Sequence, residues 1–210
     1  WYEANLLTNV SLFIFTTMET FIKKGRKQQI EEKATQLFQE KGYTATSMRD
    51  LAQVLGIEAA SLYSHIKSKE EILQKTCFLM AEEFFTAWSK VENENNSMAA
   101  KMRKAMIVHV QVVTKNTAAS AVFFNEWRHL SEPYLGDFLA MREDYEGRFM
   151  QIILDGMSSG EFKKVDKKFM MLTILSSLNW THNWYKENGN LSPEEIGERL
   201  ANLLLNGLKE

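Results

Sequence analysis

The segment Gly156-Met157-Ser158-Ser159-Gly160 matches the G-x-S-x-G pattern of serine hydrolases. In those enzymes the pattern exposes a nucleophilic serine on a strained turn between a strand and a helix. Here apolar residues at helical spacing flank the segment, which predicts the end of a helix and no such turn. We therefore expect no esterase chemistry at Ser158.

Glu126 and His129 have the Glu-x-x-His spacing that places a carboxylate and an imidazole on one helix face in di-iron bundles. The sequence has no second copy of this pair, which leaves too few ligands for a metal centre. His109 lies on an apolar stripe, where a hydrogen-bonded core histidine is the more frequent role, and the role of His182 stays open. The sequence predicts no enzyme, no metal site and no cofactor.

Residues 44–72 carry the strongest pattern of the chain: two short helices joined by a glycine turn and followed by a third helix. Gly56 can adopt the positive φ that a sharp turn requires. Ala52 is small enough for the second helix to cross closely over the first. Apolar residues at helical intervals supply a small core, namely Leu51, Leu55, Ile57 and Leu62.

Two serine-led motifs predict where these helices begin. Thr46 or Ser47 can cap the first helix, and Asp50 lies three residues after Ser47, as in a capping box. Ser68 and Glu71 form a second capping box, which begins the next helix and directs its free backbone N–H groups toward an anion.

The second helix, expected from about Glu58 to His65, carries short or flat exposed side chains that would let it enter a DNA major groove, ~12 Å wide. We expect Leu62 and Ile66 to face inward, Tyr63 to face the groove, and Lys69 to meet a phosphate. An ordinary helical hairpin without DNA is the alternative. The predicted DNA-contacting residues are Thr46, Ser47, Ala59, Ala60, Ser61, Tyr63, Ser64, His65 and Lys69.

This string of residues resembles the DNA-binding domain of the TetR family of one-component bacterial regulators. The family motif runs Thr-x-Arg-Asp-Ile-Ala-x-x-Leu-Gly-Val, then Ser-Leu-Tyr-x-His-Phe, then Lys-Glu-x-Leu. The chain matches it at residues 48–52, 55–57, 61–66 and 69–73, with Ile66 in place of the usual aromatic residue. The preceding helix also matches, with Ile30, Ala34, Leu37 and Phe38 on one face and Gly42 and Tyr43 closing it. The resemblance implies a homodimer that binds a double-stranded DNA operator.

Composition fits an all-α protein. The chain has 210 residues with only 2 prolines, and its long stretches of 3.6-residue periodicity predict helices throughout. The single cysteine, Cys77, cannot form an internal disulfide, so a reducing cytoplasm fits. A net charge of −2 is unusual for a nucleic-acid binder. However, Lys23, Lys24, Arg26 and Lys27 form either a cationic arm that contacts phosphates or a solvated tail.

Residues 1–17 fit neither expected domain. They lack an initiator methionine, and Met18 is a candidate native start. Their apolar run is far below the ~20 residues needed to span a membrane, and the features of a signal peptide are missing. We expect an expression remnant or an upstream-translated extension, or else an apolar segment that docks on the body or on a partner subunit. The expected organisation is an extension over 1–22, a three-helix DNA-binding domain over 23–70, and a helical ligand-binding and dimerisation domain over 71–210.

Beyond residue 75 the helical periodicity continues without a strand signal. Apolar stripes over 98–113 and 138–156 must be buried. A helix from about Asp166 to Tyr185 is apolar on most of its circumference, and a last helix from Ser192 to Leu208 has a leucine face. In the TetR family the last two helices of each subunit pair with their mates as a four-helix dimer interface, and the resemblance implies the same here.

The second domain is rich in methionine and aromatic residues that can line an apolar cavity between helices. A solid core is the alternative. The predicted cavity residues are Met102, Met106, His109, Phe123, Phe124, Trp127, Phe149, Trp180 and Trp184.

Residues 178–185 and 189–196, with Gly160-Glu161-Phe162, resemble a TetR branch that regulates fatty-acid and steroid breakdown and responds to acyl-CoA thioesters. The resemblance implies an acyl-CoA-like or other long apolar effector. Because no phosphate-binding glycine loop is present, basic residues near a pocket mouth would have to hold the nucleotide, with Arg103, Arg128 and Arg142 as the candidates.

The sequence thus predicts a cytoplasmic, ligand-responsive transcriptional regulator with no membrane partner. The expected regulator is a repressor that a small apolar or acyl-CoA-like effector releases from a palindromic operator. The alternative is a constitutive DNA-binding or architectural protein, which a filled core would favour over a cavity. The helix that begins near Lys69 and continues through Phe84, Phe85 and Trp88 is the expected lever between the two domains.

Overall fold

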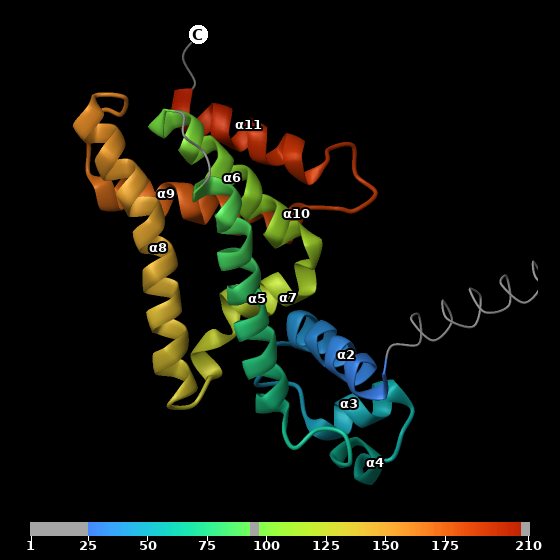
Figure 1. Cartoon of the computed structure of the whole chain (residues 1–210). Helices are drawn as coiled ribbons and strands as arrows, with labels where there is room; N and C mark the ends of the chain where they lie inside the picture. Colours follow the sequence, from blue (N-terminus) through green and yellow to red (C-terminus); the bar gives the residue numbers. More distant parts are fainter. Residues whose placement is uncertain (1–24, 93–96, 207–210) are drawn as a thin grey trace, which may run out of the picture.

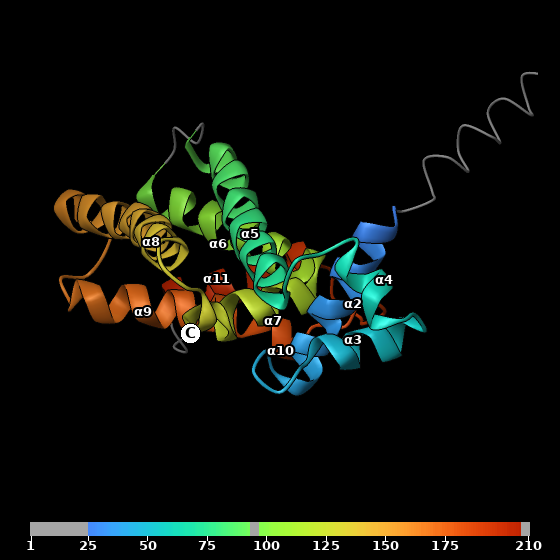
Figure 2. The ribbon, with the colours of Figure 1, turned by 90° about the horizontal axis from the view of Figure 1, so that it is seen from below.

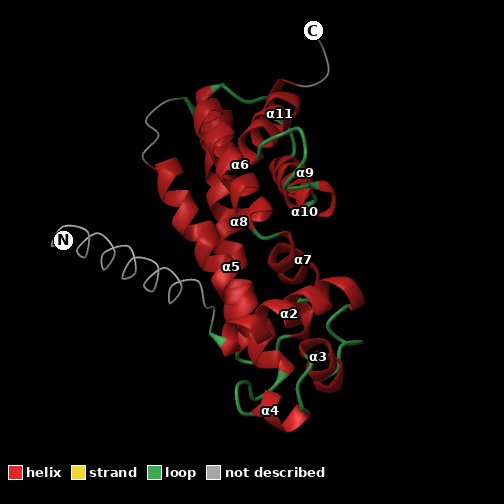
Figure 3. Cartoon of the chain, turned by 90° about the vertical axis from the view of Figure 1, so that its right-hand side faces the viewer, coloured by secondary structure: helices red, strands yellow, loops and turns green. Residues whose placement is uncertain are grey.

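The computed structural model describes residues 25–92 and 97–206. In these two ranges the protein is all-α, with no strand, as the sequence predicts. Helices from opposite ends of the described chain form the two ends of an elongated molecule (Figures 1 and 3). The predicted N-terminal extension and Lys23 and Lys24 of the predicted cationic arm lie outside the described residues.

A small N-terminal domain is built from α2 (Arg26–Lys41), α3 (Met48–Leu55) and α4 (Ala59–Tyr63) (Figure 1). Its helices are held by one buried apolar cluster, which confirms the predicted face of α2. The cluster includes Ile30, Ala34, Leu37, Phe38, Leu51, Leu62 and Ile66.

Local hydrogen bonds fix the ends of these helices where the sequence predicts them. The backbone N–H of Asp50 donates to Ser47 Oγ over 3.1 Å, and the backbone N–H of Ser47 donates to Asp50 Oδ2 over 2.8 Å. These hydrogen bonds with Ser47 lower the pKa of the Asp50 carboxyl. Gly56 ends α3 in the left-handed region, with φ of 64°. A left-handed residue at this place turns the chain sharply into α4.

Helix α5 (Lys69–Glu92) joins the small domain to the rest of the molecule. At its start, the backbone N–H of Glu71 donates to Ser68 Oγ over 3.2 Å, as predicted. The Glu71 carboxylate accepts instead from the backbone N–H of Lys67, over 2.8 Å, and pairs with Lys27 over 2.8 Å. Lys27, expected in a free cationic arm, is therefore held against α5.

The larger domain, here called the body, packs the upper part of α5 with the helices that follow it. Figure 2 shows α8 and α9 on the side of the body away from α3 and α4. The elements of the body are α6 (Met98–Lys115), α7 (Thr117–Asn125), the 3₁₀ helix η1 (Trp127–His129), α8 (Tyr134–Ser159), α9 (Lys167–Asn179), α10 (Thr181–Trp184) and α11 (Pro193–Asn206).

Helix α6 is the centre of the body. It packs against α5, α8, α9 and α11, and Met102, Ala105 and Met106 have no exposed surface. Helix α11 approaches it closely at Gly197, where an added Cβ would lie 2.7 Å from the Cα of Ile107. A side chain at position 197 would therefore force the two helices apart.

The expected single helix from Asp166 to Tyr185 is wrong: α9 ends at Asn179 and the short α10 begins at Thr181. Polar side chains at the junction bond back to the last turn of α9. Thr181 Oγ1 donates to the carbonyl of Leu178 over 2.7 Å, and His182 Nδ1 contacts the carbonyl of Asn179 over 2.6 Å. Such local bonds compete with the helical backbone ladder and favour helix ends.

The leucine face of α11 is mostly used inside the subunit. Leu200, Leu204 and Leu205 pack against the core of the body, whereas Leu203 is 46% exposed. Ser192 and Glu195 form a capping box at the start of this helix, where the sequence predicts the helix to begin.

The G-x-S-x-G segment lies at the end of α8. Ser158 is in the last turn of that helix, and Gly160 closes the helix with φ of 82°. Gly156 lies against the ring of Phe162, which occupies the space that a Cβ would need. Ser158 is thus exposed in an ordinary helical turn and lacks the strained turn between a strand and a helix that the hydrolase pattern requires. Among the described residues no helix is both long and apolar enough to cross a membrane.

Candidate functional site

The first candidate site is the exposed side of α4. Leu62 and Ile66 are buried, with 0% and 1% of their surface exposed, while Tyr63 is 55% exposed. This orientation confirms the predicted inward and outward sides. Ala60, Ser61 and Ser64 are also exposed, whereas Ala59 and His65 are half-buried. The short exposed side chains leave α4 free to approach a DNA groove closely.

Three residues predicted to contact DNA make structural contacts within the protein. Thr46 is 1% exposed and its hydroxyl donates to the carbonyl of Gly42 over 2.9 Å, so it lies in the interior. Ser47 is exposed but caps α3. The Lys69 ammonium donates to the carbonyls of Tyr43 and Thr46 over 2.8 and 2.9 Å.

Lys69 therefore acts as a clamp on the loop before α3. Besides the two short bonds, its nitrogen donates to the carbonyl of Thr44 over 3.4 Å and lies 4.3 Å from the centroid of the Tyr43 ring. An ammonium has three donors, and all three are directed at this loop. The protein's own carbonyls thus occupy the ammonium, and its expected contact with a phosphate stays a prediction. Lys67, two residues earlier, is exposed beside α4 and was not among the predicted DNA-contacting residues.

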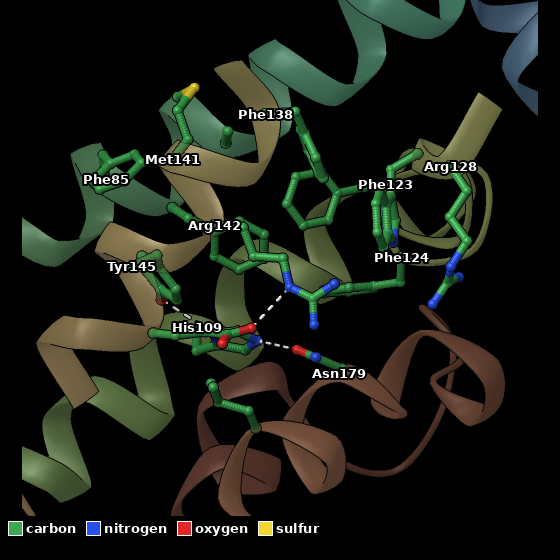
Figure 4. Close-up of a pocket in the computed structure, with 15 residues that line it drawn as sticks. Phe85, His109, Phe123, Phe124, Arg128, Phe138, Met141, Arg142, Tyr145 and Asn179 are labelled. Carbon is green, nitrogen blue, oxygen red and sulfur yellow. Dashed lines mark hydrogen bonds and ion pairs between the residues drawn. The ribbon is translucent and has the colours of Figure 1, made fainter. Parts of the chain in front are cut away.

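The second candidate site is a cavity of about 190 Å³ in the body. Figure 4 shows its aromatic side chains pointing toward one another from several helices. It is lined by Ala81, Phe84, Phe85, His109, Phe123, Phe124, Trp127, Arg128, Phe138, Met141, Arg142, Tyr145, Glu146, Leu175 and Asn179.

Four of the nine predicted cavity residues line it: His109, Phe123, Phe124 and Trp127. The assignment of the other five is corrected by their positions. Met102, Met106 and Phe149 lie in the packed core of the body with 0% exposure, and Trp180 and Trp184 lie on the surface with 64% and 44% exposure.

The predicted list of cavity residues omits four aromatic members of the wall: Phe84, Phe85, Phe138 and Tyr145. Phe138 and Tyr145 stand on the apolar stripe over 138–156, and Phe84 and Phe85 stand on the expected lever helix, whose apolar side is expected to extend toward the cavity. Helical periodicity indicates which side of a helix is buried, but it does not separate a side chain against a void from one against a full core.

His109 is the centre of a buried polar chain on the cavity wall. Its Nδ1 lies 3.1 Å from the Tyr145 hydroxyl, and its Nε2 lies 2.9 Å from Asn179 Oδ1 (Figure 4). Burial lowers the pKa of His109 to about 4 and raises the pKa of Tyr145. At neutral pH both side chains are therefore uncharged, as expected for a hydrogen-bonded core histidine.

Two of the three candidate arginines lie at this cavity. The guanidinium carbons of Arg128 and Arg142 lie 4.5 and 5.4 Å from the centroid of the Trp127 ring. Arg142 Nε pairs with Glu146 over 2.8 Å, while Arg128 is exposed. Arg103 is elsewhere, since it joins α6 to α11 through an ion pair of 2.7 Å with Glu198.

The Glu126 and His129 pair connects the body to the small domain. His129 stacks on Tyr43 with ring centroids 5.4 Å apart, and its Nε2 lies 3.3 Å from Thr44 Oγ1 and 3.5 Å from the Glu126 carboxylate. In the described part of the chain no three His, Cys, Asp or Glu side chains are grouped as metal ligands. These residues therefore form an interdomain contact beside Trp127 and Arg128.

A helix-turn-helix unit joined to a helical body with an internal cavity defines a class of one-component transcriptional regulators. Two family models match the chain. Residues 30–76 match the bacterial regulatory proteins of the tetR family, and residues 95–208 match the tetracyclin repressor-like C-terminal domain.

Individual relatives agree with these matches. The transcriptional repressor KstR2 of Mycolicibacterium smegmatis is 24% identical over 188 residues, which span 89% of this chain and 92% of the relative. The crystal structure of the TetR family regulator PfmR from Thermus thermophilus is similar with a TM-score of 0.75 and 31% identity, over 89% of this chain and 99% of that one. A structure of AibR in complex with isovaleryl coenzyme A and operator DNA is similar with a TM-score of 0.73 and 23% identity, over 86% and 98%.

The chain belongs to the TetR family of bacterial regulatory proteins. It is a DNA-binding transcriptional regulator and not an enzyme.

Proposed function

We propose that this protein is a repressor that leaves a palindromic operator when a small effector with an apolar acyl group enters the cavity of the body. Helix α5 is the observation that carries the proposal. Its first turns place Ile72, Leu73 and Cys77 in the core of the small domain, and its middle places Phe84 and Phe85 on the cavity wall. A shift of α5 at the cavity therefore moves the domain that carries α4.

The contact between η1 and the small domain supports the same coupling. Trp127 and Arg128 line the cavity, and the next residue, His129, stacks on Tyr43. Close by, the Glu70 carboxylate accepts from the backbone N–H of Ser131 over 3.1 Å. Hydrogen bonding to Ser131, by its side chain first and its backbone second, lowers the pKa of Glu70. The two domains are thus joined on both sides of the cavity, which favours a ligand switch over constitutive DNA binding.

An acyl-CoA thioester fits the chemistry of the site. A cavity of about 190 Å³ is smaller than the ~300–1,000 Å³ typical of sites that enclose a whole drug-sized ligand. It can hold a short acyl chain among aromatic rings while the nucleotide stays outside. Arg128 and Arg142 are placed for the phosphates of that nucleotide, since guanidinium groups bind phosphate with paired hydrogen bonds. The names of KstR2, a ketosteroid regulator, and of the AibR complex agree with this class of effector.

The dimer is proposed to form through the exposed side of α9. Phe169 and Leu172 of α9 and Trp180, the residue that follows it, are 71%, 44% and 64% exposed, and their spacing places them on one side of the helix. Exposed apolar stripes of this kind mark interaction surfaces. A two-fold dimer would place two α4 helices about one DNA turn apart, ~34–36 Å, and so read a palindrome.

The deciding experiment has two stages. Operator sequences are first selected from random DNA by the purified protein, with Tyr63→Ala as a variant that we expect to bind the selected DNA about 1–3 kcal/mol more weakly. Acetyl-, isovaleryl- and octanoyl-CoA are then titrated into the operator complex while fluorescence anisotropy reports DNA release. We expect at least one of them to weaken operator binding by about 5- to 150-fold, the usual range of allosteric coupling.

Arginine variants test whether the acyl-CoA binds at the cavity. Arg128→Ala and Arg142→Ala are expected to lower the affinity for the acyl-CoA and leave operator binding without effector unchanged. Arg103→Ala is the control for charge, because Arg103 is remote from the cavity and pairs with Glu198. An operator affinity that is identical with and without every acyl-CoA would favour the constitutive alternative.

A further inference from the structure

The polar chain on the cavity wall has a defined direction. Asn179 Oδ1 can only accept a hydrogen bond, so the N–H of His109 must be on Nε2, which lies 2.9 Å away. A neutral imidazole carries one N–H, which leaves Nδ1 as an acceptor. The Tyr145 hydroxyl, 3.1 Å from Nδ1, therefore donates its proton to His109.

This direction determines what remains for a ligand. The Tyr145 proton is used, so the hydroxyl presents only oxygen lone pairs. The Asn179 amide keeps both N–H donors of Nδ2, since only its oxygen is engaged by His109. Asn179 and Tyr145 both line the cavity, together with aromatic and aliphatic side chains and the charged Arg128, Arg142 and Glu146. The Asn179 amide is thus an uncharged donor on this wall, and its hydrogen bond to His109 fixes its orientation (Figure 4).

We propose that Asn179 is the specificity-determining residue of the cavity and donates a hydrogen bond to a neutral carbonyl oxygen of the effector. In an acyl-CoA this oxygen is the thioester carbonyl. The inference rests on the proposed acyl-CoA effector and adds which atom of it the protein recognises. His109 is a positioning residue, because it contacts Asn179 and Tyr145 and sets the direction of their hydrogen bonds.

The side chains of the cavity wall explain why a carbonyl is preferred over both a purely apolar ligand and a carboxylate. A purely apolar ligand would leave the Asn179 donors without a partner inside the cavity, which costs free energy. A carboxylate would lose its water beside aromatic rings and the uncharged imidazole. Of the two arginines on the wall, Arg142 already pairs with Glu146 and Arg128 is exposed to solvent. A thioester carbonyl satisfies the donor and carries no charge.

The test compares two ligands that differ in one oxygen. Isovaleryl-CoA and the thioether S-(3-methylbutyl)-CoA have the same branched carbon chain and the same nucleotide, but the thioether lacks the carbonyl. Their dissociation constants are measured by calorimetry with the full-length dimer. We expect the wild-type protein to bind isovaleryl-CoA about tenfold more tightly, as one hydrogen bond to a buried donor contributes about 1–1.5 kcal/mol, or roughly 5- to 12-fold.

Two variants assign the donor. In Asn179→Leu the preference should vanish or reverse, because the carbonyl then loses water and gains no partner. Retained binding of the thioether shows in the same experiment that this variant is folded with an open cavity. In Tyr145→Phe, which keeps the Asn179 amide, the preference should remain.

The outcomes separate this inference from the proposed function. Equal wild-type affinities for the two ligands would overturn carbonyl recognition and leave the acyl-CoA class intact. Loss of the preference in Tyr145→Phe but not in Asn179→Leu would assign the donor to the tyrosine and overturn our assignment. Failure of the wild type to bind either compound would overturn the proposed effector class together with this inference.

Discussion

The substitution Lys69→Met tests whether Lys69 stabilises the fold or binds DNA. In the structure the Lys69 ammonium holds the loop between α2 and α3 through the carbonyls of Tyr43, Thr44 and Thr46, and it lies over the Tyr43 ring. Methionine keeps most of the apolar stem and removes the charge and its three donors. The substitution therefore tests the clamp itself.

The expected loss of stability follows from these contacts. A hydrogen bond to a charged group contributes about 1.5–3 kcal/mol when it is well made, and a partly exposed cation–π contact contributes about 0.5–1 kcal/mol. Lys69 is half-buried, so water partly replaces the lost interactions. We expect a loss of about 2–3 kcal/mol in the free energy of unfolding. For a chain of this length, that loss corresponds to a decrease of roughly 4–12 °C in Tm.

Salt dependence provides the second readout. Each phosphate contact contributes about 0.9 to the slope of log affinity against log salt concentration. If Lys69 is a clamp, Lys69→Met should lower Tm and keep this slope, whereas Lys67→Met, at the exposed neighbouring lysine, should keep Tm and reduce the slope by about one. A Lys69→Met protein with unchanged Tm and a reduced slope would refute the clamp and restore the phosphate contact.

The remaining predictions concern the body. His109 has a pKa of about 4 when folded against an ordinary value of 6.5, so the unfolded state takes up the proton first. Stability should be full above about pH 6.5 and fall by about 2 kcal/mol between pH 7.5 and 5, a loss that denaturant titrations of His109→Gln should not show. Gly197→Ala should destabilise by about 1–2 kcal/mol, because its Cβ would meet the backbone of α6. The matched Gly147→Ala, with open space around it, should stabilise by about 0.5–1 kcal/mol; equal thermal shifts would refute the close approach. Phe169→Glu should run as a monomer on a sizing column, and Leu79→Glu, at an exposed leucine of α5, should stay a dimer; a dimeric Phe169→Glu protein would place the interface elsewhere.

The DNA-reading domain was predictable because short-range chemistry determines it. The Ser47 and Asp50 box and the left-handed Gly56 act within a few residues, so their residue types already specify where α3 begins and ends. Leu62 and Ile66 are buried for the same reason, since helical spacing sets their direction relative to Tyr63. The length of α4 was predicted less well: it is helical only over Ala59–Tyr63, because the chain bends again at Ser64 and His65.

The cavity was predictable only in part. His109, Phe123, Phe124 and Trp127 line it as predicted, because they lie on segments whose apolar sides meet inside the body. Met102 and Met106 lie on the same stripe as His109, but on turns of α6 that face a filled core. Whether a buried side chain borders a void depends on how far each helix slides along its neighbours, and no local pattern specifies that register.

The contacts of Lys69 could not be predicted from the sequence for a different reason. Its place in the family motif and its position after α4 suggest a phosphate contact, yet the carbonyls of 43–46 converge where its side chain ends. The same side chain is linked through Tyr43 to His129, which follows the cavity residues Trp127 and Arg128. Lys69 thus holds the loop before α3 and lies over the Tyr43 ring, which in turn stacks on His129 of the body. This position favours a role in transmitting the state of the cavity over a direct contact with DNA. The two domains are therefore connected in two ways: by side-chain contacts at the loop before α3, and by the continuous helix α5.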